Sequence, residues 1–333
     1  MKVLSLFDGI SCARVALERV GIPVEVYYAS EVDKYAIQIA QKNYPDTLRV
    51  GSVVDLQGYL ITQIDLLIGG SPCQDLSIAK KNRKGLDGVL SGLFWEYVRL
   101  LKEVKPKYFV LENVASMPKE AKDTITKELG VEPIMINAAL VSAQNRKRLF
   151  WTNIPNVKLP DDRGIFLKDI LEPKVDEVFI VKPKSNTVRS SGRGSGIDDK
   201  HNWDTIRIGT INKGGWGDRI YSPEGKSVGL LALGGGTGAK TGLYIIQTPR
   251  GNNKGGKRAL DGKVPTLSSS SWEHNNKLSD NEVIRKLTPV ECERLQSLPD
   301  NYTEGVSNTQ RYKALGNAFN VEVVAHILKG ISN

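Results

Sequence analysis

Short apolar runs alternate with helix-like stretches over the first 155 residues of the chain. The mostly apolar runs predict buried strands at residues 3–7, 24–29, 65–70, 108–111, 134–136 and 149–151. The amphipathic stretches between them predict helices at residues 12–20, 34–43 and 93–102. This alternation is typical of the α/β class, in which helices cover both faces of a mostly parallel sheet. Such sheets bind ligands at the carboxyl ends of their strands.

The pattern changes after residue 173. Helical periodicity disappears over residues 174–280, which hold 18 of the 32 glycines, so we expect a second, smaller domain rich in β-strands and loops. Helical signals return from Arg285, with Thr288 as an N-cap, and an apolar final helix at residues 321–328 is expected to pack on the first domain. The expected organisation is therefore a first domain at 1–173, a second at 174–305, and a returning C-terminal helix at 306–333.

Composition excludes several classes of protein. No apolar run approaches the roughly 20 residues that span a bilayer, so no membrane association is expected. The three cysteines form no CxxC pair and the three histidines are scattered, which argues against disulfides and against a metal site. A reduced, cytosolic protein is expected.

The net charge is +9 and the isoelectric point is near 9.3. Residues 174–280 carry 17 lysines and arginines against 10 acids, so most of the excess lies in the loop-rich segment. A basic surface on loops suits a polyanion such as nucleic acid, although the charge could equally serve solubility alone.

The first predicted strand leads through a tight glycine turn at Gly9 into a helix. A turn of this kind lets backbone N–H groups approach a ligand, but the segment lacks the GxGxxG pattern of dinucleotide sites. Glu31 ends the second strand, where an acid can bond ribose hydroxyls. These residues suit a nucleoside without a diphosphate, with S-adenosylmethionine the obvious candidate; a plain turn and a solvated acid are the alternative.

Two reactive side chains follow neighbouring strands. Cys73 comes just after the strand at 65–70, and Glu112 directly follows the run at 108–111. Both are therefore expected at the ligand edge of the sheet. A thiolate beside a carboxylic acid suggests a nucleophile and a general acid. A small buried cysteine and a strand-end acid are the alternative.

Taken together, these segments resemble the DNA (cytosine-5) methyltransferase family over nearly the full chain. The matching motifs occur in the family's order: Phe7-Asp8-Gly9, Glu31, Ser71-Pro72-Cys73-Gln74, Glu112-Asn113-Val114, Gln144-Asn145-Arg146-Lys147-Arg148, Arg285-Lys286-Leu287-Thr288-Pro289-Val290-Glu291 and Gly316-Asn317-Ala318. The stretch 69–93 resembles the catalytic loop of the animal de novo enzymes, and residues 213–222 resemble the recognition domain of small bacterial enzymes. The resemblance implies a Rossmann-like, S-adenosylmethionine-dependent methyltransferase fold with a separate target-recognition domain, of the bacterial or phage type.

The family's mechanism assigns a role to each motif residue. By resemblance, the Cys73 thiolate attacks C6 of a cytosine flipped out of duplex DNA, and C5 then takes the methyl group. Protonated Glu112 donates to N3, and Arg148 holds the base O2. The Pro72 carbonyl binds the exocyclic amine, and Arg146 completes the catalytic set.

The resemblance also implies the cofactor site for S-adenosylmethionine and its product S-adenosylhomocysteine. The residues expected to bind it are Phe7, Asp8, Gly9, Ile10, Glu31, Val32, Ser52, Leu93, Asn317 and Ala318. Ser52 is a departure, because the family usually has an acid after the glycine at this position; Asp55 or a backbone carbonyl would have to substitute.

The expected DNA contacts lie in the loop after Cys73 and in the second domain. They are Ser77, Lys81, Arg83, Lys84, Trp216 and Arg219, with Trp216 expected to fill the space left by the flipped base unless it packs in a domain core. An RNA cytosine methyltransferase and a catalytically dead homologue are the competing interpretations. We expect a monomer in the cytoplasm of a bacterial or phage-infected cell, associated with the nucleoid. A cognate restriction endonuclease, without direct contact, is a compatible partner.

Overall fold

The computed structural model describes residues 1–61, 63–72, 92–173, 207–210, 219–221, 243–247, 282–285 and 287–332. A seven-stranded sheet forms its centre, in the order β3-β2-β1-β4-β5-β7-β6. The strands are β1 (Lys2–Leu6), β2 (Val26–Ser30), β3 (Leu48–Gly51), β4 (Leu66–Gly70), β5 (Tyr108–Val114), β6 (Ile134–Asn137) and β7 (Lys147–Thr152). The first five are parallel to one another, and β7 is antiparallel to both β5 and β6. The mostly parallel sheet predicted from the sequence is confirmed.

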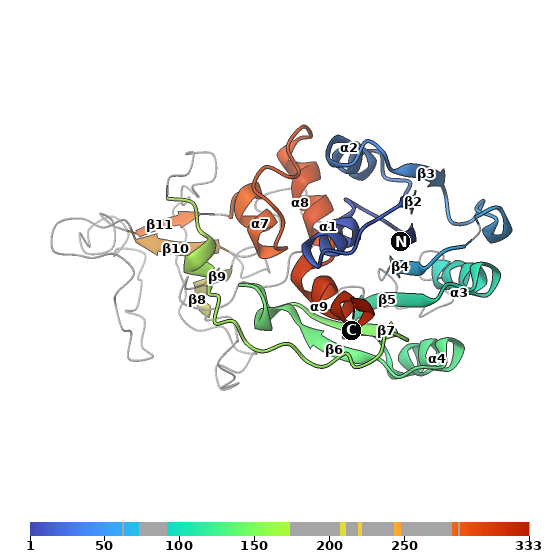
Figure 1. Ribbon diagram of the computed structural model, residues 1–333. Coiled ribbons are helices and arrows are strands. Elements are labelled where there is room, and N and C mark those ends of the chain that lie inside the picture. Colours follow the sequence, from blue (N-terminus) through green and yellow to red (C-terminus); the bar gives the residue numbers. More distant parts are fainter. Residues whose placement is uncertain are drawn as a thin grey trace.

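Helices cover both faces of this sheet, as Figure 1 shows. One apolar cluster joins the sheet to α1 (Cys12–Arg19), α2 (Lys34–Asn43), α7 (Pro289–Leu295), α8 (Asn308–Asn317) and α9 (Val321–Ser332). The other joins it to α3 (Leu93–Val104) and α4 (Lys119–Leu129). Adjacent residues of β1 show the division, because Val3 belongs to the first cluster and Leu4 to the second.

Local sequence explains why these helices begin where they do. Asp33 caps α2 by accepting the backbone N–H groups of Tyr35 and Ala36. Thr288 caps α7 in a reciprocal arrangement with Glu291, as the predicted N-cap required. The sequence analysis did not predict helix α4, because its buried residues, Ala121, Ile125 and Leu129, are separated by polar and charged residues.

The final helix, α9, packs against α1. Figure 1 shows α9 beside α1, and Arg19 of α1 pairs with Glu322 of α9 at 2.7 Å. The segment from Leu287 to Tyr302 also belongs to this body, because both residues are buried in the first apolar cluster. These contacts favour a boundary near residue 287 rather than at 305; the division into domains itself stays a prediction.

Beyond residue 173, the structure describes a second, four-stranded sheet in the order β11-β10-β9-β8. Its strands are β8 (Arg207–Thr210), β9 (Arg219–Tyr221), β10 (Leu243–Gln247) and β11 (Glu282–Arg285). They fall in the glycine-rich segment for which β-structure was expected.

Candidate functional site

The turn after β1 has an unusual backbone. Phe7, Gly9 and Ser11 all have positive φ angles, at 56°, 59° and 60°. Only Gly9 adopts such a conformation without strain, and strained residues of the other types are concentrated at functional sites. The turn follows β1 at the carboxyl edge of the sheet, where a ligand is expected. The N–H groups of Asp8, Gly9 and Ser11 bond to Ser30 O, Glu31 Oε2 and Asp8 O.

Glu31 lies beside this turn and is held by backbone N–H groups. Its Oε2 accepts Gly9 N–H at 2.8 Å, and its Oε1 accepts the N–H groups of Val32 and Asp33 at 2.7 and 2.8 Å. A carboxylate has about four lone-pair sites, so one remains on Oε2 for an external donor. Glu31 is thus fixed in place and still able to bind a hydroxyl group.

Asp8 lies beneath the turn rather than at its surface. Its carboxylate accepts Ser11 Oγ–H at 2.6 Å and Tyr27 Oη–H at 2.8 Å, with Arg49 Nη1 at 3.5 Å. Burial raises the pKa of Asp8, although these polar neighbours oppose the shift. Ile10 is buried as well, and both side chains face the interior. A ligand at this turn would therefore meet only their backbone groups.

The remaining residues expected at the cofactor site occupy mixed positions. The side chain of Val32 is 73% exposed, and Phe7 and Leu93 are partly buried next to the second apolar cluster. Ser52 Oγ accepts Val54 N–H at 3.2 Å, so this hydroxyl stabilises its own turn. At the end of α8, Asn317 is exposed, whereas Ala318 is buried.

The two glycines that end β4, Gly69 and Gly70, lie so close to their neighbours that neither position has room for a side chain. A Cβ on Gly69 would lie 2.7 Å from Leu6 O, and one on Gly70 would lie 2.7 Å from the Phe319 ring. Ser71 and Pro72 follow directly, and Ser71 Oγ accepts an N–H of the buried Asn113 amide at 3.1 Å. The backbone just before position 73 is thereby fixed to β5.

Glu112 and Arg148 meet beside this segment. Glu112 lies opposite Gly70 on one side and Phe150 on the other in the strand register, and its Oε1 lies 2.7 Å from Arg148 Nε. Their side chains are 12% and 20% exposed, so the pair is accessible from one side only. The sheet register thus brings together two predicted site residues that are 36 positions apart.

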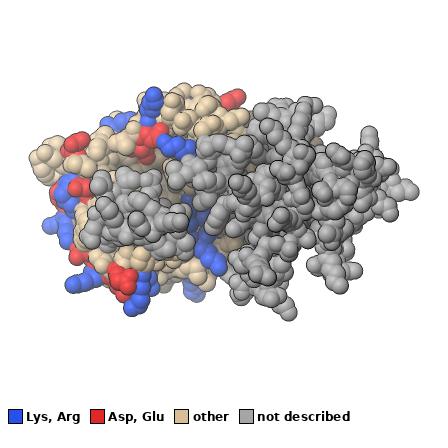
Figure 2. Space-filling model, turned by 180° about the vertical axis from the view of Figure 1, so that it is seen from behind, with Lys and Arg blue, Asp and Glu red and all other residues tan. Residues whose placement is uncertain are grey.

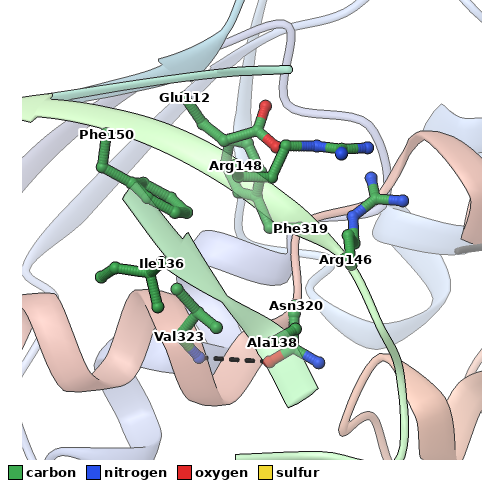
Figure 3. A pocket seen from close by; sticks show the side chains of 9 residues that line it. All are labelled: Glu112, Ile136, Ala138, Arg146, Arg148, Phe150, Phe319, Asn320 and Val323. Carbon is green, nitrogen blue, oxygen red and sulfur yellow. Dashed lines mark hydrogen bonds and ion pairs between the residues drawn. The ribbon is translucent and has the colours of Figure 1, made fainter. Parts of the chain in front are cut away.

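A pocket opens at this ion pair. Figure 3 shows Glu112 and Arg148 on its polar side and apolar side chains on the other. The apolar wall comes from Ile136, Ala138, Phe150, Phe319 and Val323. A charged pair beside an apolar wall suits a flat, polar ring.

Arg146 has a different position from Arg148. It is 5% exposed, and its Nη2 donates to Ala318 O at 2.9 Å and to Gly316 O at 3.3 Å. Arg146 therefore holds the turn that carries Phe319 into the pocket. Arg146 also lines the pocket, as Figure 3 shows, and its place among the catalytic residues stays a prediction.

Phe319 and Asn113 were missed as site residues in the sequence interpretation. Phe319 contacts the ends of β4 and β5 and lines the pocket, and Asn113 anchors Ser71. The type of residue gave no signal in either case. Asn113 lies inside the Glu112-Asn113-Val114 motif and Phe319 directly follows Gly316-Asn317-Ala318, and these positions were the only available indication.

Several predicted residues lie outside the described part of the chain. These are Cys73, Ser77, Lys81, Arg83, Lys84 and Trp216. Arg219 begins β9, where only the backbone is described. The other cysteines, Cys12 and Cys292, are both buried, and burial raises the pKa of the Cys12 thiol.

The described residues offer neither a cluster of metal ligands nor a membrane-spanning helix. No group of three or more histidine, cysteine, aspartate or glutamate side chains among them could hold a metal ion. None of the helices among them is long and apolar enough to cross a membrane.

Known proteins are similar to this chain in sequence. A family model described as C-5 cytosine-specific DNA methylase matches residues 1–333. The type II methyltransferase M.HhaI of Haemophilus parahaemolyticus is 28% identical, over 100% of this chain and 94% of that protein. The orphan methyltransferase M.SPRI of Bacillus phage SPR is 27% identical, over 99% and 97%.

Solved structures agree with the fold. The Entamoeba histolytica methyltransferase EhMeth has a TM-score of 0.70 at 16% identity, covering 99% of this chain and 97% of that one. The S. pombe Dnmt2 methyltransferase has a TM-score of 0.63 at 17% identity, covering 100% of both. The sheet is the Rossmann-like sheet of such methyltransferases, as predicted.

Proposed function

The chain belongs to the C-5 cytosine-specific DNA methylase family, and from this membership we propose how its residues methylate cytosine at C5. The enzyme is a DNA (cytosine-5) methyltransferase. The observation that carries the residue assignment is the contact of Glu112 with Arg148, directly beside the Gly70-Ser71-Pro72 segment. An acid and a cation beside the chain that leads to position 73 support the assignment.

Cys73 is the proposed nucleophile. Its thiolate would bond to C6 of the base, which turns C5 into a nucleophile. Cys12 and Cys292 are both buried, so neither is placed to reach a base. The bond from Asn113 to Ser71 supports this assignment, because it fixes the chain two residues before Cys73.

Glu112 is the proposed general acid and Arg148 its partner. Attack at C6 builds negative charge toward N3, and a proton on the Glu112 carboxyl group would neutralise it. In the described structure Arg148 occupies one oxygen of Glu112, so a bound base has to share or displace this contact. Arg148 would then hold the base O2, and the Pro72 carbonyl would accept from the exocyclic amine.

S-adenosylmethionine is the proposed methyl donor. The residues present fit it, because Glu31 retains one acceptor site beside the Gly9 turn, and Val32 and Phe7 offer apolar surface. When bound, the donor supplies an electrophilic methyl group on a sulfonium. Glu31 would bind its ribose, and Phe7 would stack on its adenine. Ser52 contributes no acid here, so the adenine amine has to meet another acceptor.

Duplex DNA is the proposed form of the substrate, with the target cytosine flipped out of the helix. Figure 2 shows basic and acidic side chains interspersed over the described part of one face. Residues 174–280, in contrast, carry an excess of seven positive charges in the sequence. This segment, with Trp216 and Arg219, is the proposed reader of the target sequence, and the cations Lys81, Arg83 and Lys84 would contact phosphates.

The decisive experiment is a covalent trap. Release of Cys73 requires loss of the C5 proton, and fluorine at C5 cannot leave as a cation. Duplex DNA with 5-fluorocytosine at the target site should therefore form an adduct that survives denaturing electrophoresis, only when S-adenosylmethionine is present. Cys73→Ala should abolish both the adduct and methylation, while DNA and cofactor binding remain. An adduct that maps to Cys12 or Cys292 would refute the assignment.

The same assay separates the competing functions. A tRNA substrate that is methylated in preference to duplex DNA would favour the RNA interpretation, and no adduct with either would favour a dead homologue. The motif residues Glu112 and Arg148 and their contact argue against a dead homologue. Association with a restriction endonuclease, the monomeric state and location at the nucleoid remain predictions.

A further inference from the structure

The Gly9 turn, residues 7–11, is bonded to a residue near the other end of the chain. Tyr302 lies in the segment between α7 and α8, and its Oη–H donates to the carbonyl oxygen of Ile10 at 2.7 Å, across 292 residues of sequence. Both residues are buried, so this bond is shielded from water. The turn is therefore held by the C-terminal part of the chain as well as by β1, from which it continues.

A second tyrosine supports the same turn. Tyr27 of β2 donates its Oη–H to Asp8 Oδ1 at 2.8 Å. Burial raises the pKa of Tyr27 and of Tyr302, so each hydroxyl keeps the proton that it donates. The two tyrosines thus bond to the residues directly before and directly after Gly9.

Gly9 connects these bonds to the proposed ribose site, because its N–H donates to Glu31 Oε2 at 2.8 Å. The positive φ angles of Phe7 and Ser11 cost free energy, which the surrounding contacts have to supply. Ile10 shares a peptide bond with Gly9, so a displacement of one moves the other. The bond from Tyr302 therefore helps to keep the Gly9 N–H in the position that orients Glu31.

The backbone around Tyr302 is itself fixed. The buried carboxylate of Glu293 accepts the N–H groups of Asn301 and Thr303 at 2.7 and 2.8 Å, and these are the residues on either side of Tyr302. Asn43 of α2 donates from Nδ2 to the Tyr302 carbonyl oxygen at 3.0 Å. The Tyr302 hydroxyl thus reaches the turn from a fixed base, as a positioning role requires.

We propose that Tyr302 is a positioning residue for cofactor binding, which holds the Gly9 turn in its binding conformation through the Ile10 carbonyl group. The proposal rests on the proposed placement of S-adenosylmethionine at Glu31. Tyr302 acts through the turn rather than by contact with the cofactor. Without its bond the strained turn relaxes in the free protein, and cofactor binding has to restore the ordered conformation at a cost in affinity.

The experiment compares Tyr302→Phe with the wild-type enzyme. Phenylalanine keeps the buried ring and removes only the hydroxyl group, so the fold is retained. In calorimetric titrations we expect the Kd for S-adenosylmethionine to rise about fivefold, the effect of one neutral hydrogen bond. In steady-state methylation of duplex DNA, kcat at saturating S-adenosylmethionine should stay within about twofold of wild type, because the lost bond serves binding and not the chemical step.

Tyr312 of α8 supplies a matched control. Its Oη–H donates to the Leu287 carbonyl oxygen, also at 2.7 Å, and neither of these residues belongs to the Gly9 turn. Tyr312→Phe should lower the melting temperature, as Tyr302→Phe does, but leave the Kd for S-adenosylmethionine unchanged. Tyr27→Phe removes the other tyrosine bond to the turn and should raise this Kd together with Tyr302→Phe.

The outcomes separate positioning from general destabilisation. An unchanged Kd in Tyr302→Phe, or an equal rise in Tyr302→Phe and Tyr312→Phe, would overturn the proposal. A rise in Tyr27→Phe alone would assign the support of the turn to β2 and would overturn it as well. If the wild-type enzyme itself does not bind S-adenosylmethionine, the proposed function fails instead.

Discussion

Replacing Glu31 tests the cofactor end of the site most directly. The carboxylate accepts three backbone N–H groups, one from the Gly9 turn and two from Val32 and Asp33. Glu31→Gln leaves one oxygen as an acceptor and turns the other into a donor. Whichever way the amide is oriented, an N–H group then faces another N–H group. The variant thus loses a bond of the turn or the site for a ribose hydroxyl.

The size of the effect follows from these bonds. A hydrogen bond to a charged group contributes roughly 1.5–3 kcal/mol, and Glu31 is partly exposed, so the lower end applies. A loss of about 1.5 kcal/mol corresponds to about a tenfold weaker Kd. Glu31→Ala removes every acceptor and should weaken binding further. Calorimetric titration with S-adenosylmethionine and with S-adenosylhomocysteine measures both variants.

A neighbouring acid provides the control for Glu31. Asp33 caps α2, and it pairs with Lys313 Nζ at 2.5 Å, away from the Gly9 turn. Asp33→Ala should cost about 1 kcal/mol of stability through the lost cap and leave cofactor affinity near wild type. If Glu31→Gln binds S-adenosylmethionine as tightly as wild type while folded, the placement of the ribose at Glu31 is refuted.

Four further predictions test other parts of the site. Gly70→Ala should destabilise the protein by about 1–3 kcal/mol in thermal melts, because its Cβ would lie 2.7 Å from the Phe319 ring; an unchanged melting temperature would contradict this. Asn113→Ala should lower kcat with cofactor affinity retained, because Ser71 loses its anchor, and equal losses in both would argue against a positioning role. The raised pKa of Asp8 means that the native state binds the proton of this carboxyl group more tightly than the unfolded state does. The free energy of unfolding of wild type, relative to Asp8→Asn, should therefore fall as pH rises above about 4. Urea titrations measure this difference, and a difference that does not change with pH would refute the prediction. Non-specific DNA affinity should fall steeply between low and physiological salt, and a flat profile would count against phosphate contacts.

The sequence predicted six of the seven strands of the first sheet, because these depend on local pattern, but it missed β3 (Leu48–Gly51), and its strand bounds differ from the structure by up to three residues. Continuous apolar runs identified β1, β4 and β5, and reactive residues just after such strands must meet at one edge. Helix α4 was not predicted, because its three buried residues lie among charged ones and give only a weak helical pattern of apolar positions. The pairing of Glu112 with Arg148 needs the antiparallel register of β7 against β5, which no local pattern specifies.

The direction in which a side chain points was the other feature that could not be predicted from the sequence. Asp8 and Glu31 are both acids next to the glycine turn, and motif position alone assigns both to the cofactor. The structure separates them, since Asp8 lies on Tyr27 beneath the turn while Glu31 accepts Gly9 N–H from beside it. Which acid faces a ligand depends on packing between strands that are distant in sequence, so the distinction requires the folded chain.

The two arginines of the Gln-x-Arg-x-Arg motif show how one motif can serve two purposes. Arg148 contacts the proposed general acid, whereas the buried Arg146 binds Ala318 O at 2.9 Å, a carbonyl that also lies 3.4 Å from Gln296 Nε2. Ala318 O is thus an acceptor shared by the pocket wall and the residue that ends α7. Because Arg146 is buried, its loss would remove the donor to Gly316 O and leave Ala318 O with only the longer bond from Gln296, which weakens the support of Phe319. The turn that carries Phe319 therefore depends on Arg146, a residue that also lines the pocket at Glu112.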